Sequence, residues 1–279
     1  MTSPAPGAPR PGRDVAGRTA VVTGGGHGLG RVMALALARA GAAVVVPDIS
    51  PEHLRALLAE EPAIIGVRAD VAEEADVRRV VDTAIGETGR LDVVVNNAGI
   101  SPAAIRADAA TNPVLFWELT GEEFRRFLGV HTVAPLLMAS AALPHMRARD
   151  WGRIVNVTTS HVTMLGRGRA AYGPPKAASE ALVAVMAHDL EGSGVTANVL
   201  IPGGAAATHP EREGTSARNL IDPEVMGPPA VFLASSDADG ITARRFQACL
   251  WDPDRSDAQN VASSAAPVAW PAAPTRPGA

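Results

Sequence analysis

The sequence predicts a single α/β domain built on a doubly wound parallel β-sheet. Short apolar runs of strand length alternate with amphipathic helical segments, a pattern typical of parallel strands covered by helices on both faces. A glycine-rich turn follows the first apolar run, and a carboxylate follows the second. The alternation predicts a sheet of about seven strands flanked by helices.

The strands and helices can be placed in order along the chain. We expect strands over 19–22, 44–47, 64–67, 91–95, 152–160, 195–201 and 244–250. We expect helices over 31–40, 73–87, 121–149 (with a possible interruption at Pro135), 177–191 and 223–235. Residues 1–14 are rich in Pro and Gly and predict a disordered leader. We expect residues 15–252 to form the folded domain, and residues 253–279 a flexible tail rich in Ala and Pro.

The composition favours a globular protein of the size of an enzyme over several other classes. The chain has 279 residues, 47% of them hydrophobic, and a net charge of −4 without a basic run, so nucleic-acid binding has no electrostatic basis. One cysteine, Cys249, excludes an intrachain disulfide, and the spacing of the histidines indicates no metal site. No uninterrupted apolar run reaches the roughly 18 residues of a membrane span, and no secretory signal is present. We therefore expect a cytoplasmic protein with no membrane, metal or nucleic-acid partner.

The glycine-rich turn Thr23–Gly30 has the character of a dinucleotide-binding turn. Its glycines allow the backbone to approach a pyrophosphate, and the N-terminus of the next helix attracts the negative charge. Asp48 comes 18 residues after Gly30 (48 − 30), close to the spacing of about 20 for a carboxylate that binds the adenosine ribose. A carboxylate there repels a 2′-phosphate and predicts NAD in preference to NADP, although a cationic His27 would soften that preference. The alternative is that Asp48 caps the helix that begins near Pro51.

Tyr172 and Lys176 form the most informative pair in the chain. They are the only tyrosine and the only lysine, among 25 Lys and Arg residues, and they stand four residues apart. Residues i and i+4 share a helix face, and a free tyrosine with a pKa of about 10 is a poor base at neutral pH. A fixed ammonium beside it favours the phenolate, and the broad guanidinium of Arg is a poor substitute for that point charge. The pair therefore predicts a general acid/base.

Together these motifs resemble those of the short-chain dehydrogenase/reductase (SDR) family of NAD(P)-binding Rossmann-fold oxidoreductases. The matching pieces extend over about residues 15–250 in the family's order. They are Thr23–Gly30, Asp48, Asp70-Val71, Asn96–Gly99, Tyr172-xxx-Lys176 and Pro202-Gly203.

The resemblance implies a hydride transfer between NAD(H) and a secondary alcohol or ketone, with Tyr172 as general acid/base. The implied catalytic residues are Tyr172, Lys176, Thr159 and His131. The implied cofactor-binding residues are Thr23, Gly24, His27, Gly28, Leu29, Gly30, Asp48, Ile49, Asp70, Val71, Asn97, Ala98, Gly99, Tyr172, Lys176, Pro202, Gly203 and Thr208. The resemblance also implies a homodimer or homotetramer paired through the helix over 121–149.

The sequence departs from the family's pattern at several of these positions. His131 stands where Asn is usual, and Thr159 stands where Ser is usual, 13 residues before Tyr172 (172 − 159). Ser160 could replace Thr159 only if the backbone shifted by one residue. Pro175 adds a second proline before the helix that carries Lys176. Thr208 comes one place later than the family's usual Thr.

Three functional hypotheses stay open at this point. The first is an active NAD-dependent dehydrogenase or ketone reductase, favoured by the retention of Tyr172 and Lys176. The second is an NAD-binding sensor or assembly subunit with a decayed site, favoured by the changes at His131, Thr159 and Pro175. The third is an epimerase or lyase on the same scaffold. Residues 101–120 form either one wall of the substrate pocket or an insertion packed on the surface. We expect a mobile lid over 204–220 and a partly apolar pocket because of Phe116, Trp117 and Met164.

Overall fold

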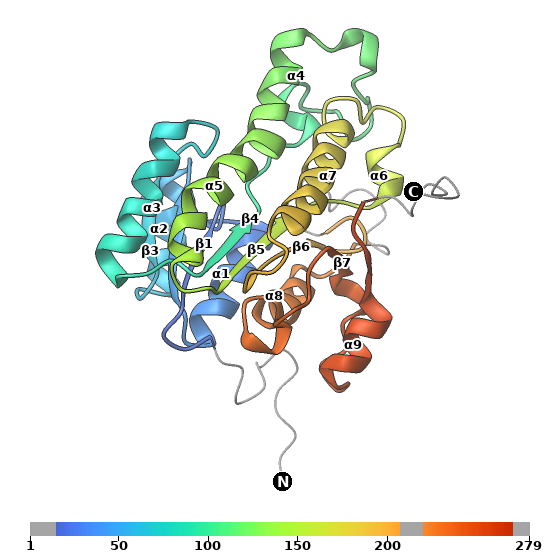
Figure 1. The fold of residues 1–279 in the computed structure, drawn as a ribbon. Coiled ribbons are helices and arrows are strands. Elements are labelled where there is room, and N and C mark those ends of the chain that lie inside the picture. Colours follow the sequence, from blue (N-terminus) through green and yellow to red (C-terminus); the bar gives the residue numbers. More distant parts are fainter. Residues whose placement is uncertain (1–14, 207–219, 270–279) are drawn as a thin grey trace.

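The computed structural model describes residues 15–206 and 220–269, which form an α/β structure around one sheet (Figure 1). The sheet has eight strands in the order β3-β2-β1-β4-β5-β6-β7-β8. All neighbours from β3 to β7 pair in parallel, and β8 is antiparallel to β7. The strands are β1 (Thr19–Val22), β2 (Ala43–Asp48), β3 (Ile65–Arg68), β4 (Val93–Asn96), β5 (Gly152–Val157), β6 (Val195–Ile201), β7 (Arg244–Gln247) and β8 (Ala265–Pro267). The predicted doubly wound parallel sheet is confirmed.

Helices cover both faces of the sheet and enclose two apolar cores. One core packs α1 (Gly28–Arg39), α2 (Pro51–Glu60) and α8 (Gly227–Leu233) on one face. The other packs α3 (Glu74–Thr88), α5 (Ala134–Arg147) and α7 (Gly173–Asp189) on the opposite face. The central strands are apolar on both sides because neither face meets water.

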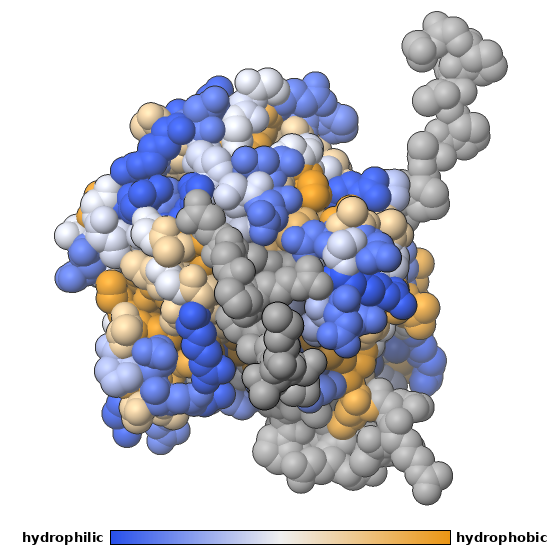
Figure 2. Space-filling model, turned by 90° about the horizontal axis from the view of Figure 1, so that it is seen from below, coloured by the Kyte–Doolittle hydropathy of each residue, from blue (hydrophilic) through white to orange (hydrophobic). Residues whose placement is uncertain are grey.

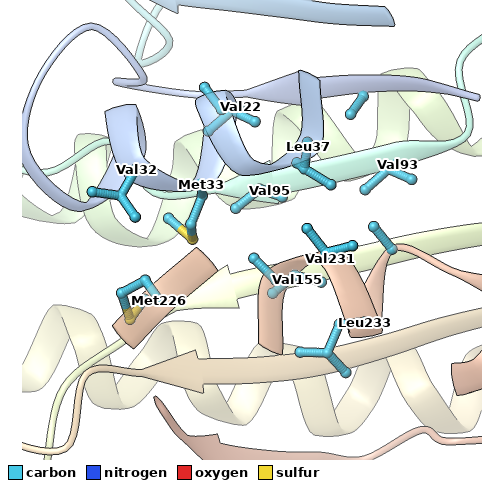
Figure 3. Close-up of a cluster of buried hydrophobic side chains, with 14 of the residues drawn as sticks. Val22, Val32, Met33, Leu37, Val93, Val95, Val155, Met226, Val231 and Leu233 are labelled. Carbon is cyan, nitrogen blue, oxygen red and sulfur yellow. The ribbon is translucent and has the colours of Figure 1, made fainter. Parts of the chain in front are cut away.

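The first core shows how alternate strand residues are used. Val22 of β1, Val95 of β4 and Val155 of β5 point to the same side, where Met33 of α1 and Val231 of α8 meet them (Figure 3). Their neighbours Val21, Val94 and Ile154 point into the other core, as the two-residue period of a strand requires. The smaller segments are α4 (Gly121–Leu128), α6 (His161–Met164), α9 (Asp257–Ser264) and the 3₁₀ turns η1 (Pro102–Ala104), η2 (Phe116–Glu118), η6 (Pro223–Met226), η7 (Ser236–Ala238) and η8 (Ala248–Leu250).

A π-helical turn, η3 (Gly129–Val133), joins α4 to α5 without breaking the helix. The N–H of Ala134 donates to the carbonyl of Gly129, five residues back. Pro135 has no N–H to offer to the carbonyl four residues back, at His131. The predicted interruption at Pro135 is therefore a widened turn just before it, and such turns are common at functional sites.

The continuous helix over 121–147 is long and apolar enough to span a membrane by length and composition. Its most apolar 18-residue window has a mean hydropathy of 1.5, and 39% of that window is buried inside the structure. The helix is apolar because Ala134, Met138, Ala142 and Met146 supply part of the second core.

The C-terminal segment differs from the flexible tail that the sequence predicts. Residues 257–267 form α9 and β8, and β8 adds an eighth strand beside β7. Helix α9 begins with a capping box, because the Ser256 hydroxyl accepts from the N–H of Gln259 while the Gln259 side chain accepts from the N–H of Ser256. The buried Asn260 side chain bonds both the N–H and the carbonyl of Asp252. Trp251 packs on Phe232 with ring centroids 4.9 Å apart.

The surface mixes residue types. Viewed from below, hydrophilic and hydrophobic residues are interspersed over the described face (Figure 2). On the helices of the second core, Val133, Leu136 and Val185 are exposed by 42%, 44% and 54%.

Two glycines in helices predict opposite effects on stability. A Cβ at Gly173, the first residue of α7, would overlap the carbonyl of Met164, whereas a Cβ at Gly86 of α3 meets nothing within 4 Å. Gly173→Ala should lower the free energy of unfolding by about 1–3 kcal/mol through overpacking. Gly86→Ala should raise it by about 1 kcal/mol because alanine favours the helix. Urea denaturation of both variants checks this, and equal effects of one sign would contradict the packing described for α6 and α7.

Candidate active site

The predicted site residues gather at one edge of the sheet, because parallel strands all end on the same side. Segments that follow β1, β2, β3, β4, β5 and β6 each contribute to this edge. The sheet order reverses direction between β1 and β4, and such switch points form the ligand crevices of open α/β sheets. Thr208 lies outside the described residues, as does most of the predicted lid.

The glycine-rich turn has a backbone that suits a pyrophosphate. Gly24 and Gly28 have φ angles of 61° and 57°, a region that favours glycine. A Cβ at Gly30 would overlap the carbonyl of Gly24, so this position also requires glycine. His27, the N-cap of α1, makes no side-chain capping hydrogen bond, which leaves the first N–H groups of the helix available to an anion.

Thr23 and Asn97 tie the ends of β1 and β4 together. The Thr23 hydroxyl accepts from the N–H groups of Asn97 and Ala98 at 2.9 and 3.0 Å. The Asn97 amide donates to the carbonyls of Thr23 and Gly24 at 3.0 and 3.2 Å. The side chains of these two predicted cofactor residues therefore stabilise the shape of the glycine-rich turn.

Asp48 ends β2 beside the glycine-rich turn. Its carboxylate accepts from the N–H of Gly26 at 3.0 Å and from the N–H of Ser50 at 2.9 Å. The alternative that Asp48 caps α2 is wrong, because Ser50 is the N-cap and accepts from the N–H of His53. The His27 and His53 rings stack with centroids 4.9 Å apart, and His53 Nδ1 lies 3.9 Å from the Asp48 carboxylate.

The neighbouring predicted residues differ in their exposure. Ile49 is exposed, whereas Val71 is buried. The Asp70 carboxylate accepts from the N–H of Ala72 at 3.0 Å and thereby forms the turn that leads to α3. Within the described residues, no cluster of His, Cys, Asp or Glu could hold a metal ion.

The start of α7 places Tyr172 and Lys176 at the site. Tyr172 is the N-cap, and the N–H of Lys176 donates to its carbonyl at 3.2 Å, the first hydrogen bond of the helix. Pro174 and Pro175 occupy first-turn positions, where an N–H has no helical partner in any case. The second proline therefore leaves this geometry intact, and α7 starts at Gly173, earlier than the expected Ala177.

Lys176 is a buried cation. Its side chain is 5% exposed, and the ammonium donates to the carbonyl of Val157 at 2.6 Å, at the end of β5. Burial lowers its pKa from 10.5 to about 8. The ammonium lies 5.9 Å from the centroid of the Tyr172 ring, so its charge acts on the phenol through a site of low dielectric constant.

His131 lies inside the π turn against the same tyrosine. Its ring meets Tyr172 edge-on, with centroids 5.0 Å apart, and its Nε2 lies 2.9 Å from the carbonyl of Ile100. The side chain is 1% exposed, and burial, together with the charge of Lys176, lowers its pKa from 6.5 to about 3. Burial keeps His131 neutral, and its Nε2 makes a hydrogen bond with the backbone of Ile100: it donates to the carbonyl in one tautomer and accepts from the N–H, at 3.3 Å, in the other. Its Nδ1 is buried without a hydrogen-bond partner among the described residues.

Three adjacent hydroxyls after β5 have different partners. Thr158 is buried and donates to the Glu180 carboxylate at 3.0 Å. Ser160 caps α6, because its hydroxyl accepts from the N–H of Thr163 at 3.1 Å. Thr159 lies between them and is partly exposed, and its hydroxyl makes no hydrogen bond among the described residues. Thr159 is thus the hydroxyl left for a ligand.

Several residues near the site were not expected from the sequence. Glu180 of α7 and Arg245 of β7 form a buried ion pair at 2.9 Å, and Arg245 also donates to the carbonyl of Thr159. Cys249 was also not expected here: its sulfur would overlap a Cβ at the predicted cofactor residue Gly203, which follows β6 with a φ of 99°. One signal was available, because Glu180 follows Lys176 by four residues and so shares its helix face.

The low pKa of His131 predicts how stability responds to acid. In the unfolded chain His131 takes up a proton at about pH 6.5, whereas in the folded chain it does so only at about pH 3. Between these values the unfolded state binds more protons, so the free energy of unfolding falls as the pH drops. One such proton contributes a slope of up to about 1.4 kcal/mol per pH unit. His131→Asn should make the profile between pH 6.5 and 4 shallower. His188→Asn, at an exposed end of α7, is the control and should keep the wild-type slope. An unchanged slope in His131→Asn, measured by urea denaturation, would contradict the neutral buried imidazole.

Comparisons with known proteins agree with this geometry. A family model described as short chain dehydrogenase matches residues 18–218. L-fucose dehydrogenase of Bos taurus is 34% identical over 241 residues, which cover 80% of this chain and 85% of the relative. Fluoren-9-ol dehydrogenase of Terrabacter sp. is 30% identical over 264 residues, which cover 86% of this chain and 73% of the relative.

The fold has a counterpart among solved structures. A hydroxysteroid dehydrogenase from Escherichia coli superimposes with a TM-score of 0.71 at 27% identity, covering 82% of this chain and 93% of the other. The family match extends over most of the residues that build the sheet and includes Tyr172 and Lys176. The chain therefore belongs to the short-chain dehydrogenase/reductase family of Rossmann-type oxidoreductases.

Proposed function

We propose that this protein is an NAD-dependent dehydrogenase or reductase that transfers a hydride between NAD(H) and a secondary alcohol or ketone. The observation that carries the proposal is the buried Lys176 ammonium beside Tyr172, at the same sheet edge as the glycine-rich turn. A buried cation carries a desolvation cost, which is offset here by the carbonyl of Val157. Keeping it next to the chain's only tyrosine has a direct chemical use in acid/base catalysis.

The residues that would hold the dinucleotide fit its parts. The N–H groups at the start of α1 suit the pyrophosphate, and the Asp48 carboxylate suits the hydroxyls of the adenosine ribose. Lys176 would hold the nicotinamide ribose. A bound nicotinamide supplies or accepts the hydride, while the protein supplies placement and a proton path. Because Asp48 repels a 2′-phosphate, we propose NAD rather than NADP.

Tyr172 would carry the proton. In reduction, its hydroxyl donates to the ketone oxygen as the carbonyl carbon receives the hydride. In oxidation, its phenolate takes the alcohol proton as the hydride leaves the same carbon. Lys176 favours the phenolate by its charge. The Thr159 hydroxyl would hydrogen-bond the substrate oxygen and stabilise the charge that develops there.

His131 would act as a positioning residue in this arrangement. A protonated imidazole would repel Lys176, but burial keeps His131 neutral. Its edge contact with Tyr172 and its hydrogen bond to Ile100 hold the phenol ring against the π turn. These contacts favour an active site over a decayed one, because the replacement for the usual Asn is packed and compatible with the charge of Lys176.

We propose an alcohol with a partly apolar body as the substrate class. Two relatives are named for the alcohols L-fucose and fluoren-9-ol, which differ widely in polarity. In this chain, Met164 is buried beside the start of α7, while Phe116 and Trp117 are exposed in edge-to-face contact at 5.0 Å. We also propose a cytoplasmic homodimer or homotetramer that buries Val133, Leu136 and Val185.

Removing the Tyr172 hydroxyl should abolish turnover without disturbing the fold. Tyr172→Phe keeps the ring that packs on His131, and general acid/base catalysis contributes about 10²–10⁴-fold. We expect kcat to fall at least about 100-fold, with the Kd for NADH changed less than about threefold. The assay follows NADH absorbance with secondary alcohols plus NAD and with ketones plus NADH. Turnover of the variant within about threefold of wild type would contradict the role of Tyr172.

Reversing the charge at Asp48 should change the choice of nucleotide. Asp48→Arg replaces a group that repels the 2′-phosphate with one that attracts it. The ratio of the NADPH and NADH dissociation constants, measured by fluorescence titration, should shift towards NADPH by at least about tenfold, or 1.4 kcal/mol. Asp48→Asn removes the charge but keeps an acceptor for the N–H groups of Gly26 and Ser50, so it should shift the ratio by less. An unchanged ratio in Asp48→Arg would refute this assignment.

A further inference from the structure

Three consecutive residues at the end of β5 are each held by a buried charged side chain. Lys176 donates to the carbonyl of Val157 at 2.6 Å. Glu180, one turn further along α7, accepts from the hydroxyl of Thr158 at 3.0 Å. Arg245 donates to the carbonyl of Thr159. Lys176 has a role in the reaction proposed above, whereas no role has been assigned there to Glu180 or Arg245.

The backbone needs this support because the sheet ends here. The β5–β6 pairing runs to Val157 and Leu200, and the N–H of Thr158 still donates to the carbonyl of Leu200 at 3.3 Å. Beyond that point β6 offers Thr159 no partner in the ladder. A buried carbonyl without a donor costs free energy, and the guanidinium of Arg245, reaching across from β7, supplies the donor.

Arg245 is in turn fixed by Glu180. The Nε of Arg245 lies 2.9 Å from the Glu180 carboxylate, and the two residues are 6% and 1% exposed. Buried ion pairs add little net stability and are often replaceable by apolar residues. This pair has a different effect, because Glu180 binds the Thr158 hydroxyl and Arg245 binds the Thr159 carbonyl. Together they fix the positions of these two residues.

The C-terminal segment closes this ion pair from outside. Arg245 faces Ala266 of β8 in the antiparallel register, and the N–H of Ala269 donates to the Glu180 carboxylate at 3.2 Å. On the solvent side, His161 Nε2 lies 3.6 Å from the same carboxylate. The segment after α9 therefore contacts the same ion pair that holds the backbone of Thr159.

We propose that Arg245 and Glu180 are positioning residues that fix the backbone of Thr159, so that its hydroxyl keeps one place relative to Tyr172 and Lys176. The inference rests on the proposed function, because it is the reaction that makes the place of this hydroxyl matter. Misplacing a catalytic group by about 1 Å can cost on the order of 100-fold in rate.

A double-mutant cycle separates positioning from general destabilisation. Arg245→Lys keeps a positive charge but lacks the planar fork that reaches Glu180 and the Thr159 carbonyl together. We expect it to lower kcat by about 10- to 100-fold with little change in the KM for NADH. In the Thr159→Val background, the same substitution should cost less than about threefold, because the hydroxyl it positions is already gone. Equal losses in both backgrounds would overturn the proposal.

The control variant is Arg244→Lys. Arg244 precedes Arg245 on β7, and its side chain points to the other face of the sheet. It should change kcat by less than about twofold in either background, since the alternation of side chains along β7 directs it away from Glu180. If Arg245→Lys fails to fold, the double variant Arg245→Met with Glu180→Met takes its place in the cycle. This double variant leaves no unpaired buried charge.

Amide hydrogen exchange tests the same idea without turnover. In Arg245→Lys, a peptide covering residues 157–164 should exchange at least about fivefold faster than in wild type, while a peptide covering β1 stays unchanged. Unchanged exchange in 157–164 would overturn the proposal whatever the kinetics show. If wild type turned over no alcohol or ketone, the proposed function would fail, and the exchange result would still decide whether Arg245 orders Thr159.

Discussion

The hydrogen bond from the Lys176 ammonium to the carbonyl of Val157 is the interaction on which the site depends. It anchors the first turn of α7 to the end of β5, and so fixes Tyr172 at the edge of the sheet where the parallel strands end. It also places a cation in a region of low dielectric constant, where a charge acts strongly on its neighbours. Burial lowers the pKa of this lysine to about 8, so the charge persists at neutral pH.

Among the described residues, no neighbouring group cancels or repels the charge of Lys176. The π turn lets a histidine stand beside Tyr172, and burial keeps that imidazole neutral. Glu180, one turn after Lys176, is engaged by Arg245 and Thr158. The ammonium, the neutral imidazole and the ion pair therefore have separate tasks around the first turns of α7: charge, packing and placement of the backbone.

Much of this arrangement can be predicted from the sequence, because it depends on local patterns. Apolar runs predict the strands, their shared polarity predicts one crowded edge, and the spacing of Tyr172 and Lys176 predicts their proximity. The Arg245–Glu180 pair escapes prediction because it joins residues far apart in the chain, and single-sequence periodicity carries no such information. The π turn escapes because Pro135 indicates a disturbance but not its form. The order in α9 had a local signal, the capping box of Ser256 and Gln259, hidden in an Ala- and Pro-rich segment.

The most direct test of this account is an ultraviolet titration of tyrosinate, since the chain has one tyrosine and needs no assignment. Wild type would be compared with Lys176→Met, and with Lys176→Arg as a variant that keeps the charge. Because the two groups interact, the curves report the pair rather than either residue alone. The account predicts that tyrosinate appears at lower pH in wild type than in Lys176→Met. Superimposable curves for these two proteins would show that the lysine does not activate Tyr172, and would contradict the account.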